Sequence, residues 1–264
     1  MLGNLFGFDS APSLVFDGDF FLRFVFSPQP ALIKGLWLTI CAAVVSQIFG
    51  VVLGGVLALC GMNKRLPLRI FNRAFLFFFR GTPLLVQLVL VYFGLPYLLG
   101  GFDLFPAYVP FGPFSVPGAL IAGIVTFSLH EAAYMSEIIR AGIESIDSGQ
   151  SEAALALGMR PALAMRRIIL PQALRVIVPP LGNQFNQMLK STSLLSVIAV
   201  PELFRVSEEI QSATYKSFEV YLGVSVYYLL LTAIWTVIQI RLERGLVHVR
   251  KDSTKPVAVP SGEA

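Results

Sequence analysis

The sequence predicts an all-α polytopic membrane protein with five transmembrane helices and a cytoplasmic loop built from two short helices. Of its 264 residues, 55% are hydrophobic and only 14% are charged, and the mean hydropathy is +0.72. Soluble domains carry roughly 25% charged residues. The composition therefore excludes a soluble domain, and a net charge of +4 is better explained by orientation in a bilayer than by nucleic-acid binding.

Long uncharged stretches define the expected spans, because a helix needs about 20 apolar residues to cross a bilayer. No charged residue occurs in 35–63, 81–102, 104–130 or 220–240, and Lys190 is the single one in 176–201. The segment 20–26 is too short to cross and is expected at the interface. We expect five spans, of which the fourth is the least apolar: 35–60, 74–99, 117–138, 177–200 and 219–241.

The distribution of basic residues orients these spans. Five of the 20 Lys and Arg residues fall in each of the segments 61–80, 139–175 and 241–264, which five spans place on one side. Loops rich in Lys and Arg stay in the cytoplasm. The N-terminus is therefore expected outside and the C-terminus inside. If 177–200 did not cross, the basic C-terminal segment would face outward.

Three parts of the chain follow from this topology. Residues 1–30 form an extracytoplasmic N-terminal segment, 31–245 form the transmembrane domain, and 246–264 form a basic cytoplasmic tail that is expected to be disordered at its end. Cys41 and Cys60 would be roughly 28 Å apart on one helix, which excludes a disulfide between them. No metal-ligating set is apparent.

The cytoplasmic segment 147–171 has more helix signals than a linker. Asp147 or Ser148 is suited to cap a first helix, with Gln150 at the capping-box position. Gly158 suits a left-handed helix end, and Pro161 suits the first turn of a second helix, which is expected to stop before Leu170. An ordinary interfacial helix pair would give the same pattern.

The residues at fixed spacing in this segment are Glu152, Ala153, Ala154, Gly158, Ile168, Leu170 and Pro171. They resemble the EAA loop of bacterial ABC-importer permeases, with every signature position occupied. The flanking segments 80–87, 133–140, 183–185 and 190–198 are similar to the polar amino acid (histidine, arginine, glutamine or opine) permease family. The resemblance covers roughly residues 30–245.

The resemblance implies partners and a mechanism. Two permease subunits, identical or sister chains, would form the pore, and a dimer of ABC ATPase subunits would hold ATP-Mg and drive it. An extracytoplasmic solute-binding protein would deliver the solute. The loop would dock on the ATPase, with Glu152 making a charge-assisted contact and the two alanines allowing close approach. The chain has no GxxxxGK[ST] loop, so it is expected to bind no cofactor and to catalyse no reaction itself.

Polar residues at membrane depth are functional candidates. The third span carries His130, Glu131 and Tyr134, and the fourth carries Asn183, Asn186, Gln187 and Lys190 at helical spacing. They would line the solute path, with Glu131 meeting an ammonium group and Lys190 a carboxylate. Alternatively, Glu131 and Lys190 have a structural role, in which they neutralise each other or satisfy backbone groups.

Two further features allow more than one interpretation. Gly50 and Gly54 favour close helix packing. The run Arg80-Gly81-Thr82-Pro83 is either a hinge or a helix start capped by Thr82. The competing functions are an ion-coupled secondary amino acid transporter, a membrane-embedded enzyme, and an exporter or receptor-like protein. The first lacks visible inverted repeats, the second lacks an acid, base or metal cluster, and the EAA-like loop argues against the third.

Overall fold

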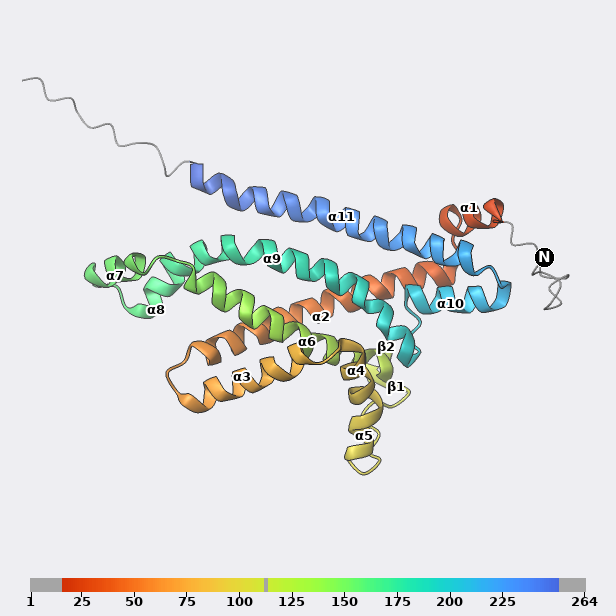
Figure 1. The fold of residues 1–264 in the computed structure, drawn as a ribbon, viewed down its shortest axis with the longest axis horizontal. Helices are drawn as coiled ribbons and strands as arrows, with labels where there is room; N and C mark the ends of the chain where they lie inside the picture. Colours follow the sequence, from red (N-terminus) through yellow and green to blue (C-terminus); the bar gives the residue numbers. More distant parts are fainter. Residues whose placement is uncertain (1–15, 112–113, 252–264) are drawn as a thin grey trace, which may run out of the picture.

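A computed structural model describes residues 16–111 and 114–251 of the chain. Within this part, four long helices run along the longest axis of the molecule: α2 (Pro30–Met62), α6 (Gly118–Glu144), α9 (Leu170–Ser191) and α11 (Ser217–Lys251) (Figure 1). Helix α9 packs its apolar residues against α2, α6 and α11, whereas Asn183, Gln187 and Lys190 on its polar face stay exposed.

Three helices of the described part are long and apolar enough to cross a membrane, namely α2, α6 and residues 217–245 of α11. A fourth candidate is the bent pair formed by α3 (Leu66–Gly81) and the helical segment 84–98. Helix α9 falls outside this group, because its amides, prolines and Lys190 lower its hydropathy. Of the five expected spans, three are matched by these helices and a fourth by the bent pair, while the crossing of α9 stays a prediction.

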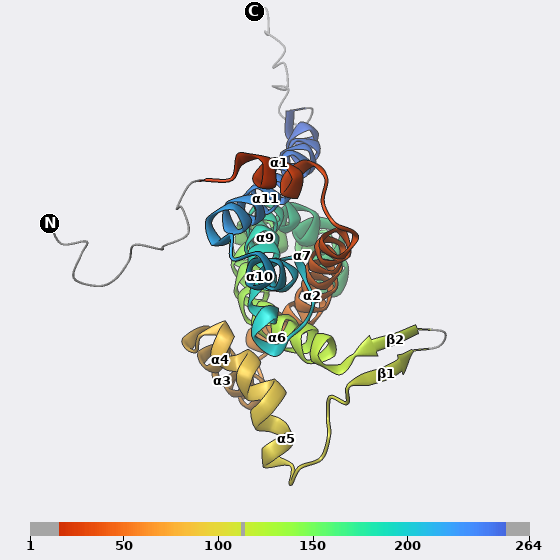
Figure 2. The ribbon, with the colours of Figure 1, turned by 90° about the vertical axis from the view of Figure 1, so that its right-hand side faces the viewer.

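The expected continuous span 74–99 is wrong, because the chain turns by 106° between α3 and α4 (Leu84–Val89). Pro83 has no backbone N–H and precedes α4, while Thr82 ends α3 with extended backbone angles. The Thr82 hydroxyl donates to the Phe78 carbonyl at 2.8 Å rather than capping α4. The run is thus a sharp bend. Beyond α4, the π-turn η2 (Leu90–Gly94) and α5 (Leu95–Leu98) project away from the bundle (Figure 2).

The three basic segments meet at one end of the bundle. The turn between α2 and α3, the helices α7 (Ser148–Ala156) and α8 (Pro161–Ala164), and the C-terminal end of α11 all lie there (Figure 1). At the opposite end lie α1 (Gly18–Phe26) and α10 (Leu203–Thr214). This arrangement is the one that the charge distribution predicts.

The second loop helix does not stop before Leu170, contrary to the prediction. Helix α8 continues through the π-turn η3 (Met165–Ile169) directly into α9, because Pro171 lies in the first turn of α9, where its missing N–H costs nothing. At its other end α9 stops at Ser191, and the rest of the expected span is the 3-10 helix η4 (Thr192–Ile198). Ala199 then ends η4 in the left-handed conformation, with φ of 58°.

Helix α10, the hairpin before α6 and the full length of α11 were not predicted from the sequence. An antiparallel hairpin of β1 (Tyr108–Phe111) and β2 (Phe114–Pro117) precedes α6 in a connection that contains several prolines. Helix α11 extends through residue 251, beyond the expected end of the fifth span at residue 241, and 252–264 lie outside the described residues.

Helices α2, α10 and α11 are joined by the buried Glu202, the N-cap of α10. Its carboxylate accepts from the backbone N–H groups of Phe204 and Arg205 at 2.9 and 2.7 Å. It also accepts from Thr39 of α2 at 3.3 Å and from Tyr228 of α11 at 3.2 Å. A buried carboxylate is stable only with such donors, so Glu202 holds this end of the bundle together.

Candidate functional site

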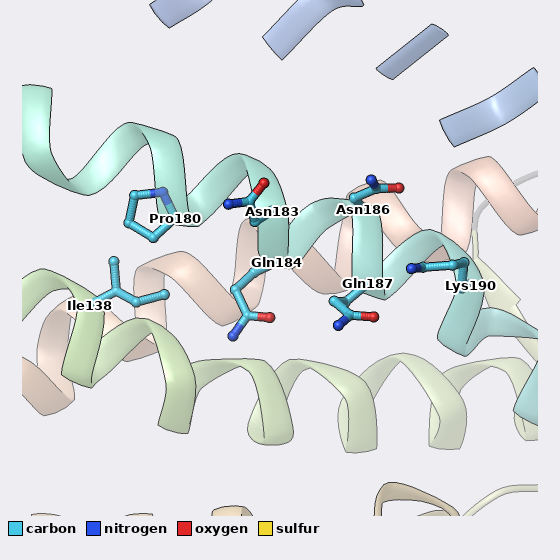
Figure 3. Close-up of a pocket in the computed structure, with 7 residues that line it drawn as sticks. All are labelled: Ile138, Pro180, Asn183, Gln184, Asn186, Gln187 and Lys190. Atoms are coloured by element: carbon cyan, nitrogen blue, oxygen red, sulfur yellow. The ribbon is translucent and has the colours of Figure 1, made fainter. Parts of the chain in front are cut away.

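The polar residues of α9 line a cavity of about 430 Å³ beside α6, which we call the amide cavity (Figure 3). In Figure 3, Gln184 and Gln187 point toward α6, while Asn183 and Asn186 lie on the opposite edge of the same helix face. On that edge Gln239 of α11 donates to Asn183 at 3.3 Å. Four of the seven lining residues are amides, Asn183, Gln184, Asn186 and Gln187, and the others are Ile138, Pro180 and Lys190.

A second cavity, of about 360 Å³, lies between α6, α9 and the bend after α3; we call it the histidine cavity. It shares Gln184 and Gln187 with the amide cavity, so the two adjoin. Of the residues predicted on the fourth span, Gln187 therefore meets those of the third span at this cavity, while Asn183, Asn186 and Lys190 line the amide cavity. Its lining residues are Thr82, Pro83, Leu84, His130, Glu131, Tyr134, Gln184, Gln187, Met188, Ser191 and Leu194.

Lys190 belongs both to the amide cavity and to a third cavity, of about 290 Å³, formed with η4, α10 and α11. Aromatic rings line this third cavity, including the stacked pair Phe204 and Tyr221, whose ring centroids are 5.9 Å apart. Shared residues of α9 thus connect the three cavities, which extend from His130 of α6 to Lys190 of α9 and beyond it to α11. A row of cavities that carries amides and ionisable side chains at membrane depth is expected where solute or water is accommodated.

Glu131 and Lys190 do not form an ion pair among the residues that the structure describes, which contradicts the proposed mutual neutralisation. Glu131 is only 3% exposed and accepts a hydrogen bond from Gln47 of α2 at 3.1 Å. A Cβ atom on Gly50 would lie 2.6 Å from the Glu131 side chain. Glu131 is thus held against α2, and the close packing expected of Gly50 is confirmed at this contact.

Gln87 of α4 is a site residue that the sequence analysis missed. It is 2% exposed, and its Oε1 lies 3.0 Å from His130 Nδ1. Its amide nitrogen donates to the Phe79 carbonyl at 2.9 Å, the Thr82 carbonyl at 3.1 Å and the Thr82 hydroxyl at 2.8 Å. Gln87 is a polar residue in an apolar run, four residues after Pro83, and this position could have marked it as a candidate from the sequence.

Between the histidine cavity and the basic end of the bundle, four charged residues form a chain of ion pairs. Arg80 of α3 contacts Glu137 of α6 at 3.0 Å, and Arg140 contacts Glu137 at 2.7 Å and Glu144 at 2.5 Å. Arg80 also lies 5.6 Å from the ring centroid of Tyr134, within cation–π range. The Arg80–Glu137 pair joins α3 to α6, while the two pairs of Arg140 lie within α6.

The residues predicted for coupling lie at the basic end of the bundle (Figure 1). Asp147 caps α7 by accepting from the Gly149 N–H at 2.7 Å, and Gly158 ends the following turn with φ of 78°. Glu152 and Ala153 are exposed, but Ala154 is 1% exposed and packs inward. Ala154 thus packs within the chain itself, and its close approach to a partner stays a prediction.

The rest of the predicted set lies on the continuous helix that leads to α9. Ile168 is half-buried, while Leu170 and Pro171 are exposed. The tip of the loop instead presents Leu155 and Leu157, which are 50% and 82% exposed. The loop thus offers an apolar tip beside one acidic side chain.

Comparison with known proteins identifies the family. A family described as "Binding-protein-dependent transport system inner membrane component" matches residues 50–248. The chain belongs to this family. As a member of it, with several apolar helices, the chain is a multi-pass inner-membrane protein.

Individual relatives of this inner-membrane family are permeases of amino-acid transport systems. The probable amino-acid permease protein YxeN of Bacillus subtilis (strain 168) is 42% identical over 85% of this chain and 95% of YxeN. The arginine transport system permease protein ArtQ of the same organism is 39% identical over 83% of this chain and 94% of ArtQ. A solved structure described as an amino acid ABC transporter with histidines matches with a TM-score of 0.74 and 37% identity, over 88% of this chain and 99% of that one.

Proposed function

We propose that the chain is the membrane permease subunit of an ATP-driven ABC importer that moves a polar amino acid, or an amino-acid-like solute such as an opine, across the cytoplasmic membrane. The observation that carries the proposal is the row of connected cavities from His130 to Lys190. The names of the amino-acid permease relatives support the solute class.

The chemistry of the cavities suits a zwitterion. An ammonium group needs hydrogen-bond acceptors, which His130, Glu131 and the amide oxygens supply. A carboxylate needs donors, which Lys190 and the amide nitrogens supply. The Oδ1 atom of Asn186 is buried without a hydrogen-bond partner among the described residues, which leaves an acceptor available beside the amide cavity. Amides accept and donate, so they suit both ends of the solute.

The chain acts with partners in this proposal. A second permease subunit, identical or a sister chain, completes the pore, and α9 crosses the membrane as the fourth of five spans. The N-terminus faces outward, where a solute-binding protein docks, and the basic end faces the cytoplasm. There a dimer of ABC ATPase subunits binds ATP-Mg and hydrolyses it, while this subunit remains non-catalytic.

Coupling to the ATPase runs through the segment 147–171, with Leu155 and Leu157 docking in an apolar groove and Glu152 pairing with a basic side chain. Because α8, η3 and α9 form one continuous helix, displacement of the loop moves the polar face of α9 directly. ATP binding can drive the pore only if the ATPase contacts its two states differently. The continuous helix supplies a physical link between the loop and the cavities.

Uptake into proteoliposomes tests the proposal. The chain is purified in mild detergent with the subunits that accompany it, and uptake of radiolabelled arginine, histidine, glutamine and an opine is measured with ATP inside the vesicles. We expect uptake that requires ATP and the binding protein and that is insensitive to proton and sodium gradients. Uptake driven by an ion gradient without ATP would overturn the proposal in favour of a secondary transporter.

A matched pair of variants tests the cavities themselves. Gln187→Ala removes an amide that lines both the amide and the histidine cavities, and we expect a severalfold loss of uptake. Leu230→Ala changes a 51% exposed side chain on the outer face of α11 and serves as control. Equal uptake by the two variants would exclude the cavities as the solute path.

A further inference from the structure

The orientation of the Gln87 amide is dictated by its neighbours. Three oxygens surround its nitrogen, two of them backbone carbonyls that only accept hydrogen bonds. The third, the Thr82 hydroxyl, uses its own proton on the Phe78 carbonyl, so it also accepts from Gln87. A flipped amide would place its oxygen against three acceptors with no proton between them. The nitrogen therefore faces the bend, and Oε1 faces His130.

The orientation of this amide determines which nitrogen of His130 carries the proton. An amide oxygen only accepts, so the contact of 3.0 Å between Gln87 Oε1 and His130 Nδ1 requires a hydrogen on Nδ1. In the neutral ring, Nε2 is then an acceptor. No protein group hydrogen-bonds Nε2 within the described residues, while the ring lines the histidine cavity beside Tyr134.

We propose that Gln87 is a positioning residue that holds His130 as the Nδ1–H tautomer, so that Nε2 accepts a hydrogen bond from a cationic donor on the solute, an ammonium or guanidinium group. The inference rests on the proposed function for the identity of the solute, but its tautomer statement does not. The Gln87 amide nitrogen binds three oxygens at the bend between α3 and α4, and the oxygen of the same amide contacts His130. The geometry of the bend therefore determines which His130 nitrogen faces the solute as an acceptor.

Nitrogen NMR tests the tautomer independently of transport. The full chain, with its co-purifying subunits in lipid nanodiscs, is labelled with ¹⁵N-histidine, and His248→Asn leaves His130 as the single imidazole of this chain. The permease is labelled separately and then assembled with unlabelled subunits, so that only its own histidine contributes signals to the spectrum. We expect a protonated Nδ1 and an unprotonated Nε2 near pH 7.5. An Nε2–H tautomer or an imidazolium would overturn the inference.

The Gln87→Leu variant tests the positioning role with the same spectrum. Leu has no acceptor for Nδ1, so we expect the Nε2–H tautomer to become populated. Thr82→Val removes one acceptor and keeps two carbonyls in place, so its spectrum should stay as in the parent chain. An unchanged tautomer in Gln87→Leu would overturn the role of Gln87.

A pair of substitutions at His130 separates solute contact from structural support, and it holds even if Gln87→Leu does not fold. The amide nitrogen of His130→Asn takes the place of Nδ1 and keeps the bond to Gln87, but it leaves nothing at Nε2. The longer His130→Gln places a polar group near Nε2. Losing one hydrogen bond to a charged group should raise the KM for a cationic amino acid about tenfold or more in His130→Asn.

Uptake by His130→Gln should stay closer to that of the parent chain, with kcat little changed in both variants. A normal KM in His130→Asn together with a raised KM in His130→Gln would show that only the bond to Gln87 matters, and would overturn the solute contact. Absence of amino-acid uptake by the parent importer would instead refute the proposed function, while the NMR result would stand.

Discussion

Replacing Gly54 with Ala should separate α2 from α6 and destabilise the bundle. A Cβ atom at this position would lie 2.4 Å from the Met135 Cβ and 3.0 Å from the Ala132 carbonyl oxygen. Nonbonded carbon atoms prefer about 3.5–4.0 Å, so the first contact is too short by about 1 Å. Met135 is fully buried and its Cβ is fixed to the α6 backbone, so no rotamer change relieves the clash.

Gly55, one residue further along α2, provides the matched control. A Cβ atom there would meet only the Ile139 Cδ1 atom, at 4.0 Å. Both substitutions gain the same helix propensity, roughly 1 kcal/mol, so that contribution cancels in the comparison. Overpacking a well-packed core costs about 1–3 kcal/mol. We therefore expect Gly54→Ala to be less stable than Gly55→Ala by about 2 kcal/mol.

Thermal unfolding in detergent, followed by size-exclusion chromatography with fluorescence detection, measures this difference. For a chain of this size, about 2 kcal/mol corresponds to a midpoint roughly 4–8 °C lower in Gly54→Ala than in Gly55→Ala. Uptake should fall in parallel, since the same helix pair holds Glu131 against Gly50. Equal midpoints for the two variants would refute the argument that the two backbones approach too closely for a methyl group.

Three further predictions concern other parts of the chain. Gly158→Asp should abolish ATP-driven uptake while the protein stays in the membrane, because the φ of 78° at this position strains an L side chain. The control is Gly245→Ala, at a helical position where an added Cβ atom meets no other atom within 4 Å. Full uptake by Gly158→Asp would exclude a role for this turn. Glu131→Gln should reduce uptake of cationic solutes more than uptake of neutral ones, measured as a ratio of uptake rates; equal effects would leave Glu131 a structural residue. The Lys216 ammonium hydrogen-bonds the Asp17 carboxylate and lowers the pKa of Asp17 below its ordinary value of 3.8. The attachment of α1 to α11 by this pair should therefore be complete above pH 3.8 and lost as the pH falls through the lowered pKa; hydrogen exchange of α1 that is as slow at pH 2 as at pH 6, after correction for intrinsic rates, would contradict this.

Much of the architecture follows from local sequence. The positions of α2, α6 and α11 follow from uncharged stretches, and the grouping of three basic segments at one end follows from the spacing of Lys and Arg. The cap at Asp147 and the turn at Gly158 follow from residue types that favour those conformations. The cap and the turn depend on interactions within about one helical turn, and each span depends on the composition of its own stretch.

The bend at Thr82 and Pro83 could be located but not interpreted from the sequence. A proline after a threonine is compatible with a hinge or a helix start, and what decides between them is Gln87, which binds three oxygens at the bend. The hairpin before α6 was missed because its strands are short and contain proline, which weakens any strand pattern.

The candidate site was predicted residue by residue but not as an arrangement. Sequence identified His130, Glu131 and Lys190 as costly at membrane depth, since the price of burying a polar group depends on the group alone. The hydrogen-bond partner of each side chain depends on the neighbouring helices: Glu131 accepts from Gln47 of α2, and His130 contacts Gln87 of α4. Hydropathy and charge act locally and so determine the helices and their common ends. The amide cavity, the histidine cavity and the contact between His130 and Gln87 instead arise between segments more than 40 residues apart, which only the packed bundle brings together.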